Sequence, residues 1–229
     1  FNLHKYNLMG GIMYKFKILT VFLLFFVIFY KVDANIVEAP LLNKVIYVDP
    51  GHGGIDPGAY YKGIHEEDIN LEISLKLKKN LEKMGAIVYL TRDGDYDLSN
   101  PKSSLRKRTD LYNRAQAINN SNADIYLSIH LNASKSTSWQ GAQAFYDDIN
   151  EENKKIAETF QKYFNKYLNS NRKAKEIKDL YMYKRIKIPG LLLEVGFISN
   201  PNERYILRQN WYQEKIAKVI SNCLVEILV

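Results

Sequence analysis

VIYVDPGHGG, residues 45–54, joins an apolar run of strand length to a glycine-rich turn that carries a histidine. A helical pattern follows, because apolar residues recur every fourth position between residues 69 and 81, and Gly85 then provides a stop. A strand followed by an amphipathic helix is the repeating unit of α/β proteins. This stretch therefore predicts a sheet with helices packed against it.

The rest of the chain continues the alternation. Further runs of strand length are residues 86–91, 124–130, 141–146, 180–184 and 190–195. Helical spacing predicts helices over residues 105–119, 156–167 and 216–227. Six strands and four helices suit one α/β domain, and 229 residues are too few for two well-buried cores once a leader is removed.

Composition excludes several classes of protein. With 46% hydrophobic and 25% charged residues, the chain is neither disordered nor collagen-like. A single cysteine, Cys223, cannot form an internal disulfide and is expected to be a small core residue. The net charge of +7 comes from basic residues dispersed among acids, so we do not expect a nucleic-acid partner.

The N-terminal segment has the features of a secretory signal. Residues 18–30 are uncharged and apolar, Lys15 and Lys17 precede them, and Val-Asp-Ala follows at 32–34. We therefore expect a signal peptide over 1–34, a linker over 35–43, a catalytic domain over 44–229 and an exported, extracytoplasmic protein. A membrane anchor is the alternative, although 13 apolar residues fall short of the roughly 20 that cross a bilayer.

Polar residues with catalytic chemistry lie where three predicted strands end. His52 follows the first strand, His130 ends the strand in SIHLNA, and Glu194 lies within LLLEVGF. Open α/β sheets bind ligands at the carboxyl edge of their strands. A carboxylate among apolar residues is costly unless it is paired or functional, so Glu194 is a candidate catalytic group, with a structural ion pair as the alternative.

A fourth candidate is Glu66 or Glu67, just before the first helix. Acids at a helix start also favour the helix dipole, so the residues alone leave this choice open. Two histidines, one carboxylate and a free glutamate would suit a hydrolytic zinc site, because three ligands leave a position for water and the free glutamate can move its proton. The spacing matches none of the short zinc motifs.

Two polar stretches, residues 93–104 and 132–140, are predicted to be surface loops. The second contains Asn132 and Trp139, which we expect to contact the substrate. An exposed indole could stack on a sugar or peptide, and the alternative is that Trp139 anchors its loop on the sheet.

Four motifs occur in order: VDPGHGG at 48–54, G-x-x-E-x-D-x-N-L at 63–71, SIHLNA at 128–133 and LLLEVGFISNPNE at 191–203. Together they resemble the zinc-dependent N-acetylmuramoyl-L-alanine amidase family of peptidoglycan hydrolases. The resemblance implies a six-stranded, mostly parallel sheet with helices on both faces and one Zn²⁺ at its carboxyl edge. It also implies His52, Glu66 and His130 as zinc ligands and Glu194 as the catalytic acid/base. Leu131 departs from the alanine usual in the family.

Residues 108–134, 139–146 and 188–203 are more specifically similar to the germination-specific amidases of spore-forming bacteria, which act in making spore-cortex muramic-δ-lactam. The resemblance implies peptidoglycan as the substrate and the amide between the lactyl group of N-acetylmuramic acid and L-alanine as the bond cleaved. Two alternatives stay open: a vegetative autolysin of the same chemistry and a non-catalytic wall-binding relative. The sequence also leaves open an accessory or activating protein partner and the oligomeric state.

Overall fold

The computed structural model describes residues 39–229, so the predicted signal segment lies outside the described residues. One sheet has the strand order β4-β1-β5-β8-β6-β7. Its strands are β1 (Val45–Pro50), β4 (Ile87–Leu90), β5 (Ile125–Asn132), β6 (Gln143–Tyr146), β7 (Lys175–Glu176) and β8 (Gly190–Phe197). Four of its neighbouring pairs are parallel, and only β6 and β8 are antiparallel. The predicted six-stranded, mostly parallel sheet is confirmed.

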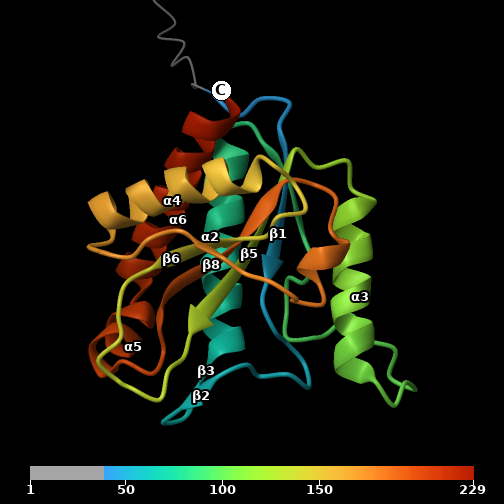
Figure 1. Cartoon of the computed structure of the whole chain (residues 1–229), viewed down its shortest axis with the longest axis vertical. Coiled ribbons are helices and arrows are strands. Elements are labelled where there is room, and N and C mark those ends of the chain that lie inside the picture. Colours follow the sequence, from blue (N-terminus) through green and yellow to red (C-terminus); the bar gives the residue numbers. More distant parts are fainter. Residues whose placement is uncertain (1–38) are drawn as a thin grey trace, which may run out of the picture. The chain divides into compact units, whose positions relative to one another are not determined.

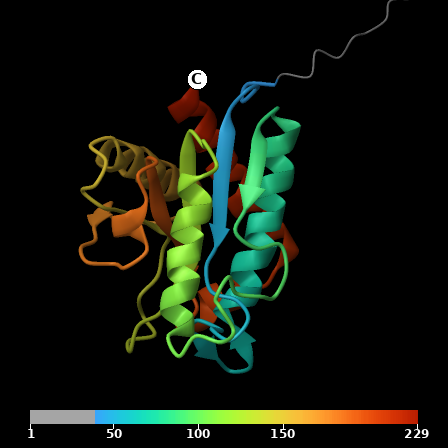
Figure 2. The ribbon, with the colours of Figure 1, turned by 90° about the vertical axis from the view of Figure 1, so that its right-hand side faces the viewer.

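Helices cover both faces of this sheet (Figures 1 and 2). They are α2 (Glu66–Lys83), α3 (Arg106–Asn119), α4 (Asn153–Tyr167), α5 (Pro201–Leu207), α6 (Asn210–Leu228) and the 3-10 helix η1 (Tyr183–Arg185). One face is packed by α2, α4 and α6, whereas α3 and η1 lie on the other. A short hairpin, β2 (Tyr60–Tyr61) and β3 (Ile64–His65), precedes α2.

The main core lies between the sheet and the helices α2, α4 and α6. The four apolar positions that predicted α2 are all buried in it: Ile69, Ile73, Leu77 and Leu81. Each such side chain contributes about 1.5–3 kcal/mol when fully buried. Cys223 is also fully buried as a free thiol, as expected for a small core residue. Leu41, within the predicted linker, packs in the same core.

The prediction of a strand over residues 180–184 was wrong. Met182, Tyr183 and Ile186 are the buried residues there, which is the spacing of a helical turn and not the alternation of a strand. Backbone hydrogen bonds from Lys184 to Leu180 and from Ile186 to Tyr183 close the turn. The sixth strand is β7, whose two residues are exposed and so give no apolar signal.

Parallel pairing brings the ends of β1, β5 and β8 to the same edge of the sheet. Asp49 of β1 is level with Ser128 of β5, and His130 of β5 is level with Glu194 of β8. The turn after β1 begins at this level, so the polar residues that follow or end these strands meet at one place.

Candidate active site

The structure brings together His52, Glu66, His130 and Glu194, the four residues expected to carry the chemistry. His52 follows β1, His130 lies in β5, Glu194 lies in β8, and Glu66 is the first residue of α2. A cleft of about 270 Å³ is lined by His52, His130 and Glu194. Three strands and one helix therefore supply a single site.

Glu66 lies at the centre of this group. Its Oε1 is 3.3 Å from His52 Nε2 and 3.1 Å from His130 Nδ1, and it accepts a hydrogen bond from the Leu131 backbone N–H at 3.0 Å. Its Oε2 accepts from the Ala59 N–H at 2.9 Å. These contacts fix the carboxylate, which is only 4% exposed, between the two imidazoles.

Glu67, the other acid at this helix start, points elsewhere. Its Oε1 lies 3.4 Å from His65 Nδ1, on the hairpin, and its Oε2 is buried without a hydrogen-bond partner among residues 39–229. The geometry therefore distinguishes two neighbouring glutamates that the residue types alone could not.

The positions of the His52, Glu66 and His130 side chains are compatible with a bound metal ion. One ligand atom each from His52, Glu66 and His130 can be chosen so that all three lie within 4.8 Å of one another. The contacts of 3.1 and 3.3 Å are close to the edge of a tetrahedron around zinc, about 3.3 Å for ligand bonds of about 2.0 Å. Two imidazoles and one carboxylate are also a donor set of catalytic zinc sites. These residues could hold a metal.

The electrostatics of the protein alone are those of a cation site. Burial by itself disfavours the charged form of Glu66, but hydrogen bonds from His130 and His52 outweigh it and hold the pKa of Glu66 well below its usual range. Burial likewise opposes a charge on His52, yet the carboxylates of Asp56 and Glu66 raise the pKa of His52 to about 9. A bound metal would replace the proton that these carboxylates favour.

Glycine at position 51 allows the turn to pass close to His130. A Cβ added to Gly51 would lie 2.3 Å from two atoms of the His130 ring, a distance that no side chain tolerates. The next residue, His52, has φ 64°, a left-handed conformation that is uncommon for a residue with a side chain. Such strain persists only where the surroundings hold the backbone in place.

Two buried arginines provide that support. Arg92 donates to the carbonyl oxygens of Pro50 and Gly51 at 3.0 and 2.9 Å. Arg114 donates to the carbonyl oxygens of Pro50 and His52 at 2.9 and 2.6 Å. Both arginines are 1% exposed. Their hydrogen bonds fix the path of the turn and hence the place of the His52 ring.

Arg114 is itself held by buried carboxylates. Asp49 and Asp110 each lie 2.9 Å from its guanidinium. Burial tends to raise the pKa of Asp49, but Arg114 and hydrogen bonds from Ser128 and Thr91 lower it overall. The ion pair therefore links α3 to the end of β1.

Glu194 is not part of a Lys or Arg ion pair within residues 39–229. Its Oε2 is buried and lacks a hydrogen-bond partner, and no lysine or arginine in the described part of the chain forms an ion pair with it. Burial and the negative charge of Glu66 raise the pKa of Glu194 to about 8, although His52 opposes the rise. A structural ion pair therefore does not explain this carboxylate.

Asn132 and Trp139 do not line the cleft. Asn132 is the last residue of β5, and its carbonyl oxygen accepts from the Ile198 N–H. Trp139 is 51% exposed, and the Arg172 guanidinium lies 4.7 Å from the centre of one of its rings. The indole is thus partly packed and partly free, and contact of either residue with the substrate stays a prediction.

Sequence reasoning did not find several residues at the cleft. Asp56 lies 3.1 Å from His52 Nδ1 and 2.9 Å from Lys107 Nζ, and Tyr181 lines the same wall. Only the nearness of Asp56 to His52 in sequence could have pointed to it. Lys107 and Tyr181 are distant from β1 in sequence, and only the tertiary fold brings their segments to the cleft.

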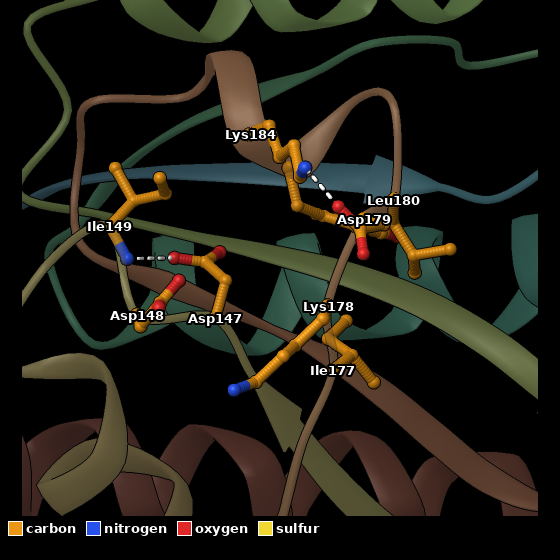
Figure 3. A pocket seen from close by; sticks show the side chains of 9 residues that line it. Asp147, Asp148, Ile149, Ile177, Lys178, Asp179, Leu180 and Lys184 are labelled. Atoms are coloured by element: carbon orange, nitrogen blue, oxygen red, sulfur yellow. Dashed lines mark hydrogen bonds and ion pairs between the residues drawn. The ribbon is translucent and has the colours of Figure 1, made fainter.

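A second hollow, of about 150 Å³, lies beside Tyr183 and is lined mainly by charged side chains (Figure 3). Two of its three carboxylates already have partners: Asp147 accepts from the Ile149 N–H, and Asp179 pairs with Lys184. Within residues 39–229 the only grouping of metal-ligand side chains is that of His52, Glu66 and His130. The cleft lined by His52, His130 and Glu194 is therefore the candidate active site.

A family model described as N-acetylmuramoyl-L-alanine amidase matches residues 46–226, which include all four site residues. The chain belongs to this family. A germination-specific N-acetylmuramoyl-L-alanine amidase of Bacillus subtilis is 44% identical over 185 residues, which cover 79% of this chain and 78% of that protein. The amidase LytC of the same organism is 32% identical over 191 residues, 82% of this chain but only 36% of LytC.

Solved structures of other amidases share the fold. The CwlD amidase from Clostridioides difficile, solved in complex with the GerS lipoprotein, aligns with a TM-score of 0.77 and 40% identity, over 81% of this chain and 98% of CwlD. Another N-acetylmuramoyl-L-alanine amidase, from Clostridium difficile 630, aligns with a TM-score of 0.73 and 29% identity, over 81% and 96% of the two chains. The predicted family and the similarity to germination-specific amidases are confirmed.

Proposed function

We propose that this amidase is an exported zinc enzyme that hydrolyses the amide between the lactyl group of N-acetylmuramic acid and L-alanine in peptidoglycan. The observation that carries the proposal is the grouping of His52, Glu66 and His130 beside a glutamate that has no structural partner. A non-catalytic wall-binding relative would need neither the three candidate metal ligands nor an unpaired glutamate beside them. Family membership supplies the identity of the bond.

His52, Glu66 and His130 would hold the ion, and Glu194 would move the proton. Zinc, when bound, lowers the pKa of water and polarises a carbonyl group. Glu194 would accept a proton from the attacking water and deliver it to the nitrogen of L-alanine as the C–N bond breaks. The carboxylate forms no ion pair with a lysine or arginine of the described residues, which leaves it free to accept a proton and release it again.

Zinc content tests the assignment of the ligands. His52→Ala and His130→Ala should each lose the metal in elemental analysis and stop cleaving purified peptidoglycan, as followed by mass spectrometry of the products. His65→Ala is the matched control, because His65 lies on the hairpin outside the group. Full zinc retention in either ligand variant would contradict the assignment.

We further propose that the enzyme acts in forming muramic-δ-lactam in the spore cortex. The 44% identity to a germination-specific amidase over most of both chains favours this role. The 32% identity to LytC makes a vegetative autolysin the second candidate. Muropeptide analysis of spores from a strain that lacks the protein decides between them: missing lactam supports the cortex role, whereas intact lactam with unseparated cells supports the autolysin.

Export and an accessory protein partner are also part of the proposal. Relatives named as cell wall amidases fit a site of action outside the cytoplasmic membrane, and CwlD was solved with a lipoprotein. Among residues 39–229 no helix is long and apolar enough to cross a bilayer. Sequencing the protein from its native host should give an N-terminus near Asn35; recovery of the intact residues 18–30 would instead support an anchor.

A further inference from the structure

The cleft at Glu194 continues along α3. Besides the catalytic candidates it is lined by Lys107, Leu111 and Tyr181. A third hollow, of about 480 Å³ and open to solvent, shares these three residues and extends past Leu105 and Arg108. We call this continuous surface, from the cleft to Arg108, the α3 trough. The trough lies along α3, the helix that covers this side of the sheet in Figure 2.

Two cations at the outer end of the α3 trough lack acidic partners among the described residues: Arg108 lines the trough, and Arg185 lies against Tyr181, which also lines it. Arg106 and Lys107 are occupied, because each lies 2.9 Å from a carboxylate oxygen, of Asp97 and Asp56 respectively. Arg108 and Arg185 form no ion pair with an acid in the described residues.

Both free cations lie against one aromatic ring. Their guanidinium carbons are 5.0 Å (Arg108) and 3.6 Å (Arg185) from the centre of the Tyr181 ring. Stacking on a common ring orders the two arginines, and Arg185 also donates from Nη1 to the Tyr181 carbonyl oxygen. Neither guanidinium is paired with a carboxylate among residues 39–229, so their remaining N–H groups can bind an anion from solvent.

The separation from the reaction centre fits a short peptide. Six residues of α3 separate Arg108 from Arg114, which contacts the His52 carbonyl, and this corresponds to about 9 Å along the helix axis. An extended peptide advances about 3.3 Å per residue. A chain that starts with L-alanine at the cleft would therefore reach the free arginines about two or three residues later.

We propose that the α3 trough binds the peptide part of the substrate and that Arg108 and Arg185 bind a carboxylate on its third or fourth residue. The proposal rests on the proposed function, because the peptide's L-alanine must lie at the cleft. Leu105 and Leu111 offer apolar contact along the way, and a charged carboxylate is the group that two unpaired guanidinium ions select. A glycan strand of uncharged sugars would gain nothing from them.

Three substrates test this subsite. They are an N-acetylmuramoyl-tripeptide with free carboxylates, the same compound with its carboxylates amidated, and N-acetylmuramoyl-L-alanine amide. Arg108→Gln and Arg185→Gln should each raise KM for the acidic tripeptide about tenfold, the effect of losing one charge-assisted hydrogen bond. KM for the two neutral substrates and kcat for all three should not change. Arg208→Gln is the matched control, because Arg208 is exposed and does not line the trough.

The outcomes separate this proposal from the proposed function. Unchanged KM in both variants, or equal losses on acidic and neutral substrates, would overturn the subsite. If the zinc-loaded wild-type protein cleaves none of the three compounds, the proposed function fails instead. In that event the affinity for the free acidic tripeptide, measured by calorimetry, still tests the subsite. About tenfold weaker binding to the variants than to the wild type supports the subsite, and equal binding refutes it.

Discussion

Replacing Glu194 by glutamine separates a catalytic carboxylate from a structural one. The substitution preserves the shape of the side chain and removes its ability to transfer a proton. General acid–base catalysis typically contributes about 10²- to 10⁴-fold, so turnover should fall by that factor. The proposed zinc ligands are untouched, so the folded variant should keep its metal.

The structure also predicts the effect of this change on stability. In the metal-free protein, burial and Glu66 raise the pKa of Glu194 from 4.5 to about 8. A carboxyl group with a raised pKa costs folding free energy as pH rises from about 4.5 towards about 8, because the unfolded chain ionises first. At pH 7 this cost reaches at most about 3 kcal/mol. Glutamine does not ionise, so the Glu194→Gln variant avoids this loss of folding free energy.

The metal-free variant should therefore melt at or above the wild-type temperature at pH 7, with a gain of about 2–4 °C for each kcal/mol. The difference should grow between about pH 5 and about pH 8, the range over which wild-type Glu194 is costly. A lost structural ion pair would do the opposite, because it would leave a cation buried and lower Tm.

Thermal melting, bound zinc and muropeptide cleavage should be measured on one preparation. Glu203→Gln is a suitable control, because Glu203 is a largely buried acid outside the cleft that accepts from the backbone N–H groups of Phe197 and Gly141. The amide nitrogen of glutamine cannot accept from one of these N–H groups, so the substitution should lower Tm, and turnover per folded molecule should not change. A folded, zinc-loaded Glu194→Gln protein that cleaves at the wild-type rate would refute the catalytic role.

Two substitutions test how the turn at His52 is held. Gly51→Ala should prevent zinc binding, because its Cβ would lie 2.3 Å from the His130 ring. Gly94→Ala is the control and should bind zinc normally, because the nearest atoms to its Cβ are 3.4 Å away. Equal zinc content in the two variants would contradict the packing argument. Arg114→Met should reduce the free energy of unfolding by about 3–5 kcal/mol in chemical denaturation, because Asp49 and Asp110 lose their buried partner. The exposed Arg208→Met should change it by less than about 0.5 kcal/mol, and a similarly small effect at Arg114 would show that the buried network is dispensable.

Local patterns in the sequence were sufficient for most of the fold. Apolar residues every fourth position predicted α2, and continuous apolar runs predicted β1, β5 and β8, because strands buried on both faces carry little else. The same patterns misled at residues 180–184. There the alternation of Tyr and Met resembles a strand, but Tyr183 turns inward to hydrogen-bond Ser128 and the backbone forms a helical turn.

The sequence by itself determined which residue types are available for chemistry: two histidines at strand ends, two acids at a helix start and one glutamate in an apolar strand. Only the tertiary structure decided that Glu66, and not Glu67, lies between the imidazoles and that Arg114 on α3 holds the His52 turn. It also decided that Arg108 and Arg185 lie against the same Tyr181 ring without an acidic partner among residues 39–229. The physical reason is the range of the interactions. Periodicity and turn residues report contacts between near neighbours along the chain, whereas these contacts join segments separated by tens of residues and depend on strand register and helix packing.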